Sequence, residues 1–89
     1  MKIKKGYNLR TVAGEKIVIP LADESRKNQG IFKLNDEGAS LFNLFKNGGE
    51  ISDGAKLLSE SYGITLKQAE QDVSEFVELL NQFNMLEEE

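Results

Sequence analysis

The chain contains neither cysteine nor histidine, and these two absences exclude most ordinary catalytic and metal-binding sites. Without cysteine there is no disulfide framework, thiolate metal site or cysteine nucleophile. Without histidine the sequence lacks the commonest metal ligand and the usual general base near neutral pH, which excludes Ser-His and histidine-metal mechanisms. We therefore expect no enzyme activity, no catalytic residues, no metal and no organic cofactor.

Proline and long apolar runs are also scarce. The chain has 89 residues, one proline and 39% hydrophobic residues, which predicts a single domain over residues 1–89, too small for a large buried active site. The amino-terminal run M-K-I-K-K-G-Y-N is basic but has no apolar core, and no run approaches the length of a membrane span. We expect a cytoplasmic protein without a membrane partner.

The net charge of −4 is unevenly distributed. Residues 1–33 carry eight basic and three acidic side chains, whereas residues 34–89 carry three basic and twelve acidic ones. The front of the chain is therefore basic and the rest acidic. Since charge constrains fold only weakly, this asymmetry is equally consistent with an ordinary solvated surface.

The first third of the sequence predicts strands. Residues 9–12 and 15–21 flank Ala13-Gly14, and Gly14 can supply the positive φ of a tight hairpin turn. Pro20 lacks an N–H group, so the second strand should finish near it. The polar run 22–29 predicts a mobile loop.

A third strand is predicted over residues 30–34, where the side chains alternate between two faces. Phe32 and Leu34 share one face, and Ile31 and Lys33 share the other. We expect the apolar pair to point towards the helices.

Three helices follow. Asn35 is a suitable N-cap for the first, with Leu34 and Ala39 in hydrophobic-staple positions. Its apolar stripe and its ending are both clear in the sequence: the stripe is Leu41, Phe42, Leu44 and Phe45, and the ending is Asn47-Gly48-Gly49. Ser52 is the predicted cap of the second helix, which carries Ala55, Leu58 and Tyr62 and closes at Gly63.

The third helix, residues 66–83, is the longest and most clearly specified. Thr65 and Gln68 have the spacing of a capping box. Apolar residues then recur every three or four positions, at Ala69, Val73, Phe76, Val77, Leu80 and Phe83. Most of this face should be core.

Together these elements predict an α+β fold in the order β-β-β-α-α-α, a winged helix-turn-helix-like architecture with a three-stranded antiparallel sheet followed by three helices. Such a shape often binds DNA. Here the helix that would enter the major groove has one basic residue, Lys67, and four acidic ones, Glu70, Asp72, Glu75 and Glu78. Because DNA affinity depends on cations that meet phosphates, we expect no nucleic-acid partner, although a DNA-binding regulator remains an alternative.

Four segments of the sequence resemble the PqqD family, and together they span nearly the whole chain. They are R-T-V-A-G-E at 10–15, L-N-D-E-G-A at 34–39, K-N-G-G at 46–49, and the D-V-x-x-F-x-x-x-L pattern at 72–80. The resemblance implies a small non-catalytic domain, also called the RiPP recognition element, that takes part in pyrroloquinoline quinone (PQQ) biosynthesis or in another natural-product pathway based on a ribosomally made, modified peptide. It would act as a peptide chaperone that captures the leader segment of a precursor peptide and presents it to a modifying enzyme such as a radical SAM protein.

The resemblance also implies a peptide-binding site. In the family an extended peptide adds to the edge of the third strand and the third helix forms the groove wall. These elements correspond here to Gly30, Ile31, Phe32, Lys33 and Leu34 on the strand and to Asp72, Val73, Glu75, Phe76 and Leu79 on the helix. Phe32 and Phe76 would shape apolar pockets or simply belong to the core. Lys33 would select an acidic leader residue or only discourage unwanted strand pairing.

The oligomeric state stays open between a monomer and a dimer formed through the unpaired strand edge. A structural dimerisation module is accordingly a further alternative to peptide capture.

Overall fold

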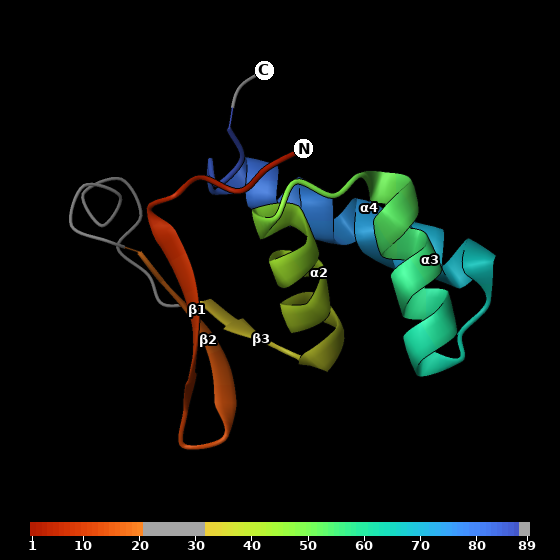
Figure 1. Ribbon diagram of the computed structural model, residues 1–89, viewed down its shortest axis with the longest axis horizontal. Coiled ribbons are helices and arrows are strands. Elements are labelled where there is room, and N and C mark those ends of the chain that lie inside the picture. The colour runs from red at the N-terminus through yellow and green to blue at the C-terminus, as the bar shows by residue number, and fades with distance from the viewer. Residues whose placement is uncertain (21–31, 88–89) are drawn as a thin grey trace.

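The structure, a computed structural model, describes residues 1–20 and 32–87. Its elements are β1 (Tyr7–Val12), β2 (Glu15–Pro20), β3 (Phe32–Leu34), α2 (Asp36–Lys46), α3 (Ile51–Tyr62) and α4 (Leu66–Gln82). Figure 1 shows the sheet on one side of the molecule, α2 next to it, α3 on the far side, and α4 behind α2 and α3. Within the described residues, three antiparallel strands are followed by three helices, which confirms the predicted α+β order.

The sheet has the order β1-β2-β3, so β2 is central and both of its neighbours are antiparallel to it. β1 and β2 pair from Tyr7↔Pro20 to Val12↔Glu15. The two turn residues, Ala13 and Gly14, have φ values of 51° and 81°, as a tight I′ hairpin turn requires. The hairpin and its end at Pro20 are confirmed, and β1 starts two residues earlier than predicted.

β3 pairs with β2 in the register Lys16↔Leu34, Ile17↔Lys33 and Val18↔Phe32. Phe32 and Leu34 pack against the core, whereas Lys33 is exposed, as the alternation predicted. The predicted strand residues Gly30 and Ile31 and the predicted loop at 22–29 lie outside the described residues, as does residue 21.

The junction between β3 and α2 forms as predicted. The Asn35 side chain accepts a hydrogen bond from the Gly38 N–H at 2.8 Å, which caps the helix. At the other end of the helix, Asn47 is the C-cap and Gly48 follows with a φ of 89°.

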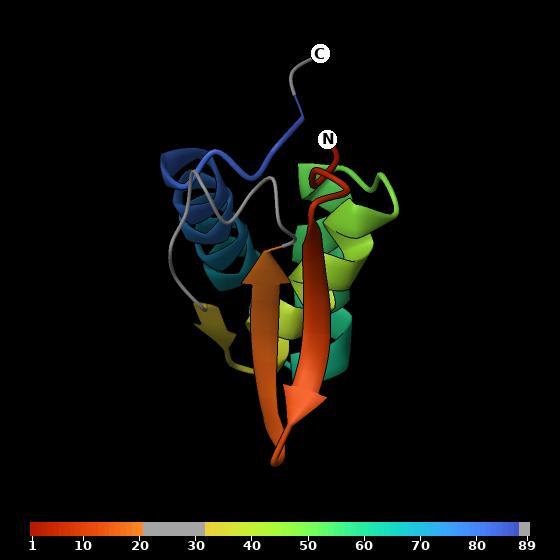
Figure 2. The same ribbon diagram turned by 90° about the vertical axis from the view of Figure 1, so that its left-hand side faces the viewer.

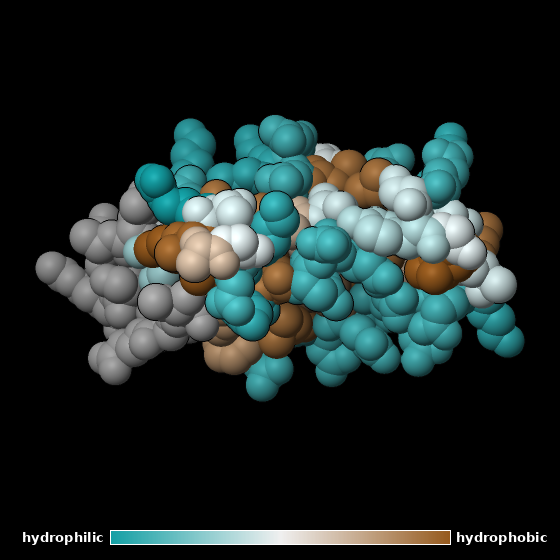
Figure 3. Space-filling model, turned by 90° about the horizontal axis from the view of Figure 1, so that it is seen from below, coloured by the Kyte–Doolittle hydropathy of each residue, from teal (hydrophilic) through white to brown (hydrophobic). Residues whose placement is uncertain are grey.

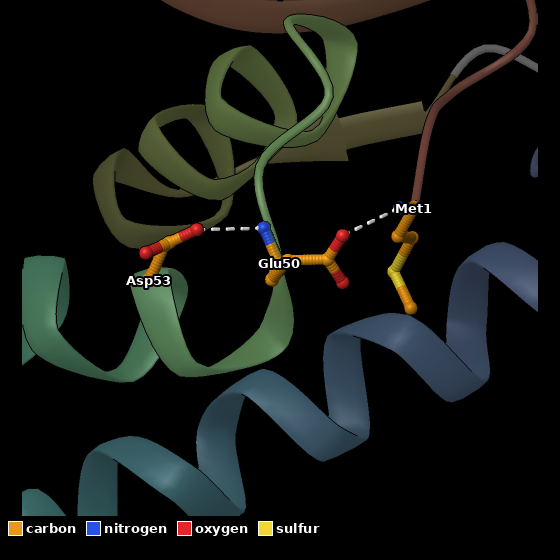
Figure 4. A network of polar contacts seen from close by, with 3 residues as sticks. All are labelled: Met1, Glu50 and Asp53. Atoms are coloured by element: carbon orange, nitrogen blue, oxygen red, sulfur yellow. Dashed lines mark hydrogen bonds and ion pairs between the residues drawn. The ribbon is translucent and has the colours of Figure 1, made fainter.

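The predicted cap of α3 was wrong. The helix starts at Ile51, one residue before Ser52, and its N-cap is Glu50. The Glu50 N–H donates to Asp53 Oδ2 at 2.9 Å, while the Glu50 carboxylate faces the Met1 amino group at 3.4 Å (Figure 4). Asp53, the third residue of the helix, therefore accepts the backbone N–H of the N-cap residue, as in one half of a capping box.

The far end of α3 follows the prediction except at one side chain. Gly63 closes the helix in the left-handed conformation, with a φ of 67°. Ala55 and Leu58 are buried, but Tyr62 is 38% exposed and its hydroxyl lies 2.9 Å from Ser40 Oγ. A phenol at the end of a helix can bury part of its ring and keep its hydroxyl at the surface.

α4 starts at the predicted cap, because Thr65 Oγ1 accepts from the Gln68 N–H at 3.1 Å. The Gln68 side chain does not complete the expected capping box; it donates to Asp72 at 2.8 Å instead. The buried face of the helix consists of Ala69, Val73, Phe76 and Leu80, as the spacing predicted.

The amino-terminal segment is part of the core, which the sequence pattern did not reveal. Ile3 and Tyr7 have no exposed surface. The Ile3 N–H donates to the Phe45 carbonyl at 3.2 Å, and the Lys4 N–H donates to the Met85 carbonyl at 2.8 Å. The first residues thus join the ends of α2 and α4, near the two termini at the top of Figure 1.

The Lys46 side chain binds the backbone of this segment. Its ammonium group donates to the carbonyls of Lys4 at 3.0 Å and Tyr7 at 2.5 Å. Burial lowers the pKa of Lys46; the negative charge of Glu87 opposes this shift and the positive charge of Lys2 adds to it.

Candidate functional site

A groove runs between the end of β3, the start of α2 and the middle of α4. It consists of two adjoining hollows of about 290 and 460 Å³, which share Asn35, Gly38, Phe76 and Leu79. We call it the β3–α4 groove and define it by the residues that line the two hollows: Lys33, Leu34, Asn35, Glu37, Gly38, Leu41, Asp72, Glu75, Phe76 and Leu79.

One border of the groove is an edge strand. Within the described residues β3 pairs with β2 on one side only, and Figure 2 shows it at the edge of the sheet on the same side of the molecule as α4. An edge strand presents N–H and C=O groups that an extended segment can pair with. Lys33 and Leu34 belong both to this edge and to the groove.

The floor of the groove is apolar. Leu41 and Phe76 are core residues that reach it, with Phe76 only 8% exposed. Leu34 and Leu79 are half-buried, and Leu79 is not one of the core residues. Gly38 also lines the groove. A Cβ at this position would lie 3.2 Å from Asn35 Oδ1 and 3.4 Å from Leu34 Cβ. A larger residue would crowd the Asn35 cap.

The polar part of the groove is acidic. Glu37, Asp72 and Glu75 line the smaller hollow. Within the described residues no lysine or arginine forms an ion pair with them. Lys33 is the one basic residue in the lining, and its ammonium group is already 2.7 Å from Glu15 Oε1. Figure 3, a view from below, shows brown apolar atoms in several separate groups with teal hydrophilic atoms between them.

The structure brings together six of the ten predicted site residues. Lys33, Leu34, Asp72, Glu75, Phe76 and Leu79 all line the groove. Phe32 packs edge-on against Phe83, with ring centroids 4.6 Å apart. Val73 is fully buried and its methyl groups lie beside Gly54 of α3. Gly30 and Ile31 lie outside the described residues.

Sequence reasoning missed four residues of the lining: Asn35, Glu37, Gly38 and Leu41. Three of them belong to the L-N-D-E-G-A segment, which was interpreted as a helix start and a family motif and not as part of a binding site. The available signal was Gly38, because a glycine in the first turn of a helix indicates a close approach.

Other kinds of site have little support in the described part of the chain. There, no group of three or more acidic side chains is arranged to hold a metal ion. The outward face of α4 is acidic, which disfavours nucleic acid. Across residues 1–20 and 32–87, no helix combines the length and the apolar character needed to cross a membrane.

Comparison with protein families supplies the decisive observation. The family model described as "Coenzyme PQQ synthesis protein D (PqqD)" matches residues 15–86, which include every residue of the β3–α4 groove. The chain belongs to the PqqD family. Of the four segments that suggested this family, three lie inside the matched range and the segment at 10–15 only touches its start.

Two solved structures share the PqqD fold of this chain. One, "TbiB1 in Complex with the TbiA(beta) Leader Peptide", has a TM-score of 0.78 and 19% identity over 100% of this chain and 98% of the other. The second, "Lasso peptide synthetase B1 complexed with the leader peptide", has a TM-score of 0.75 and 18% identity over 94% and 93% of the two chains. Comparison with curated protein sequences gives no significant match.

Proposed function

We propose that this PqqD-family protein is a non-catalytic peptide chaperone. Its single domain, residues 1–89, binds the leader segment of a ribosomally made precursor peptide in the cytoplasm and presents it to a modifying enzyme, of which a radical SAM protein is one example. The observation that carries the proposal is the β3–α4 groove, which combines an edge strand with an apolar floor. Both similar solved structures are described as complexes with a leader peptide.

The groove geometry supports binding by strand addition. An extended peptide beside β3 would pair with main-chain groups of residues 32–34 and place alternate side chains over the floor formed by Leu34, Phe76 and Leu79. A micromolar complex requires about 8 kcal/mol, whereas one net hydrogen bond contributes on the order of 1 kcal/mol. Main-chain pairing and apolar anchors must therefore act together.

A proline scan of the peptide tests this mechanism. The probes are synthetic leader segments of short precursor peptides encoded beside the gene, and binding is measured by fluorescence anisotropy with the full chain. Proline at a position whose N–H pairs with β3 should weaken binding at least about tenfold, because it removes a donor and prevents close pairing. Proline outside the paired segment should have little effect. A scan without any sensitive position would refute strand addition.

The edge of β3 that has no partner strand among residues 1–20 and 32–87 also allows self-association, so the alternative of a dimerisation module needs its own measurement. Light scattering at increasing protein concentration, with and without the leader segment, separates the two. If strand addition binds the leader, the peptide should convert any dimer that forms through this edge into monomer.

A further inference from the structure

The β3–α4 groove also indicates which peptides it accepts, and this inference rests on the proposed function. We propose that the bound segment carries a basic side chain, lysine or arginine, beside its apolar anchor, and that Asp72 and Glu75 of α4, together with Glu37 of α2, select it. The groove is thus specific for basic peptides rather than for acidic ones.

The three carboxylates belong to two elements on opposite sides of the smaller hollow. Asp72 and Glu75 are three residues apart on α4, so they lie on one face of this helix. Glu37 lies in the first turn of α2. A side chain that enters the hollow therefore meets negative charge on both walls.

Neutral partners hold two of these carboxylates in place without removing their charge. Gln68 Nε2 donates to Asp72 Oδ1 at 2.8 Å, and Gln71 Nε2 donates to Glu75 Oε1 at 3.4 Å. An amide donor orients a carboxylate but leaves its unit charge available to a cation. Asp72 and Glu37 are also half-buried, which reduces screening by solvent and salt.

Two positive charges near the groove do not cancel this field. The start of α2 carries about half a positive charge from the helix dipole, but Asp36 and Glu37 both lie in its first turn and outweigh it. Lys33 projects from the exposed side of β3 and pairs with Glu15 at 2.7 Å. These contacts disfavour the earlier hypothesis that Lys33 selects an acidic leader residue.

The apolar floor explains why a long basic side chain fits better than a small cation. Leu41, Phe76 and Leu79 line the same hollow as the carboxylates. The methylene chain of lysine or arginine can cover such a floor while its charged end reaches the rim. No metal-binding arrangement of acidic groups occurs in the described residues, which agrees with carboxylates that are spread along two walls.

The test is a selection of random 12-residue peptides on the full chain, followed by measurements on synthetic peptides. Three proteins are compared: the unaltered chain, the Asp72→Asn/Glu75→Gln variant, and the Glu70→Gln/Glu78→Gln variant. The control pair changes the net charge equally on the same helix, at two exposed residues that do not line the groove. Nuclear magnetic resonance (NMR) shifts at residues 32–34 identify the selected peptides that occupy the edge strand.

We expect the unaltered chain and the control to enrich peptides with lysine or arginine close to an apolar residue, and the groove variant to lose this preference. In a selected peptide, replacing the key lysine with norleucine, which keeps the aliphatic chain, should weaken binding to the unaltered chain about three- to tenfold. The same replacement should have almost no effect on the groove variant.

Three outcomes would overturn the inference. Peptides that shift residues 32–34 without any basic preference would refute the charge selection and leave the proposed function intact. An equal basic preference in the groove variant would show only general attraction to a protein of net charge −4. Failure to select any peptide that shifts residues 32–34 would refute both the inference and the proposed function.

Discussion

Leu79 offers the sharpest test of the groove by mutation. It lines both hollows, is half-buried and is not one of the core residues, whereas Phe76 is almost fully buried in the core. Truncation of a buried phenylalanine costs roughly 3–5 kcal/mol and could unfold a domain of this size. The Leu79→Gln substitution introduces a polar side chain that is one heavy atom longer and suits a helix, so it should change peptide binding more than folding.

The expected magnitude follows from what the peptide would cover. Full burial of a leucine is worth about 1.5–3 kcal/mol, and because Leu79 is half-buried, its exposed part should account for at most about a third of this. Covering a glutamine amide without a partner adds a penalty of about 1 kcal/mol or more. The total of about 1–2 kcal/mol corresponds to a five- to thirtyfold higher dissociation constant.

The assay is anisotropy of a labelled leader segment, with urea unfolding measured on the same samples. Leu66→Gln is the matched control, because Leu66 is 55% exposed on α4 and does not line the groove. We expect Leu66→Gln to leave peptide affinity unchanged. Equal affinity for both variants, or a loss explained entirely by unfolding of Leu79→Gln, would refute the assignment of α4 as the groove wall.

Two further predictions concern stability. Ala13→Asn should raise the free energy of unfolding by roughly 0.5–1 kcal/mol, since Ala13 has a φ of 51° and asparagine tolerates this conformation better than alanine; an unchanged urea midpoint would contradict this. Lys46→Met should lower the free energy of unfolding by about 1–3 kcal/mol, because the carbonyls of Lys4 and Tyr7 lose their donor. Burial lowers the pKa of Lys46 in the folded chain, so the unfolded chain binds this proton more tightly. The free energy of unfolding of the unaltered chain should therefore increase as the pH rises towards the usual lysine pKa, and its difference from that of Lys46→Met should grow. A stability difference that is independent of pH in this range would contradict the burial of Lys46.

The features that the sequence predicted correctly depend on neighbouring residues. Asn35, Thr65 and Gly63 cap or close their helices, and Gly14 forms the hairpin turn. In each case the side chain or the glycine acts within a few residues of its own position, so local propensity decides the outcome. The order of strands and helices follows from these local signals.

The features that sequence reasoning missed depend on residues far apart in the chain. Ile3 and Tyr7 lie in a short basic run whose alternation is interrupted by Lys5 and Gly6 and which gave no clear strand signal, and Ile3 is paired with Leu86 near the other end of the chain. The cap of α3 was wrong for a related reason, since several side chains near residue 50 can cap a helix and the sequence does not rank them. Glu50 is placed there beside Met1.

Only part of the groove was predicted, because the groove also depends on contacts between residues far apart in the chain. The resemblance to the PqqD family implied one wall, residues 72–79 of α4, and the docking edge on β3. The opposite wall, Glu37 and Gly38, depends on how α2 packs against α4, and the one local signal for it was the glycine at position 38. The pairing of Lys33 with Glu15 likewise depends on the strand register.

An NMR titration of the ¹⁵N-labelled full chain with its leader segment tests the central claim most directly. Strand addition in the β3–α4 groove predicts that amide shifts concentrate at residues 32–34 and 72–79, and that the β3 amides become more protected from hydrogen exchange. Shifts confined to the β1–β2 hairpin, with unchanged exchange at residues 32–34, would contradict the account.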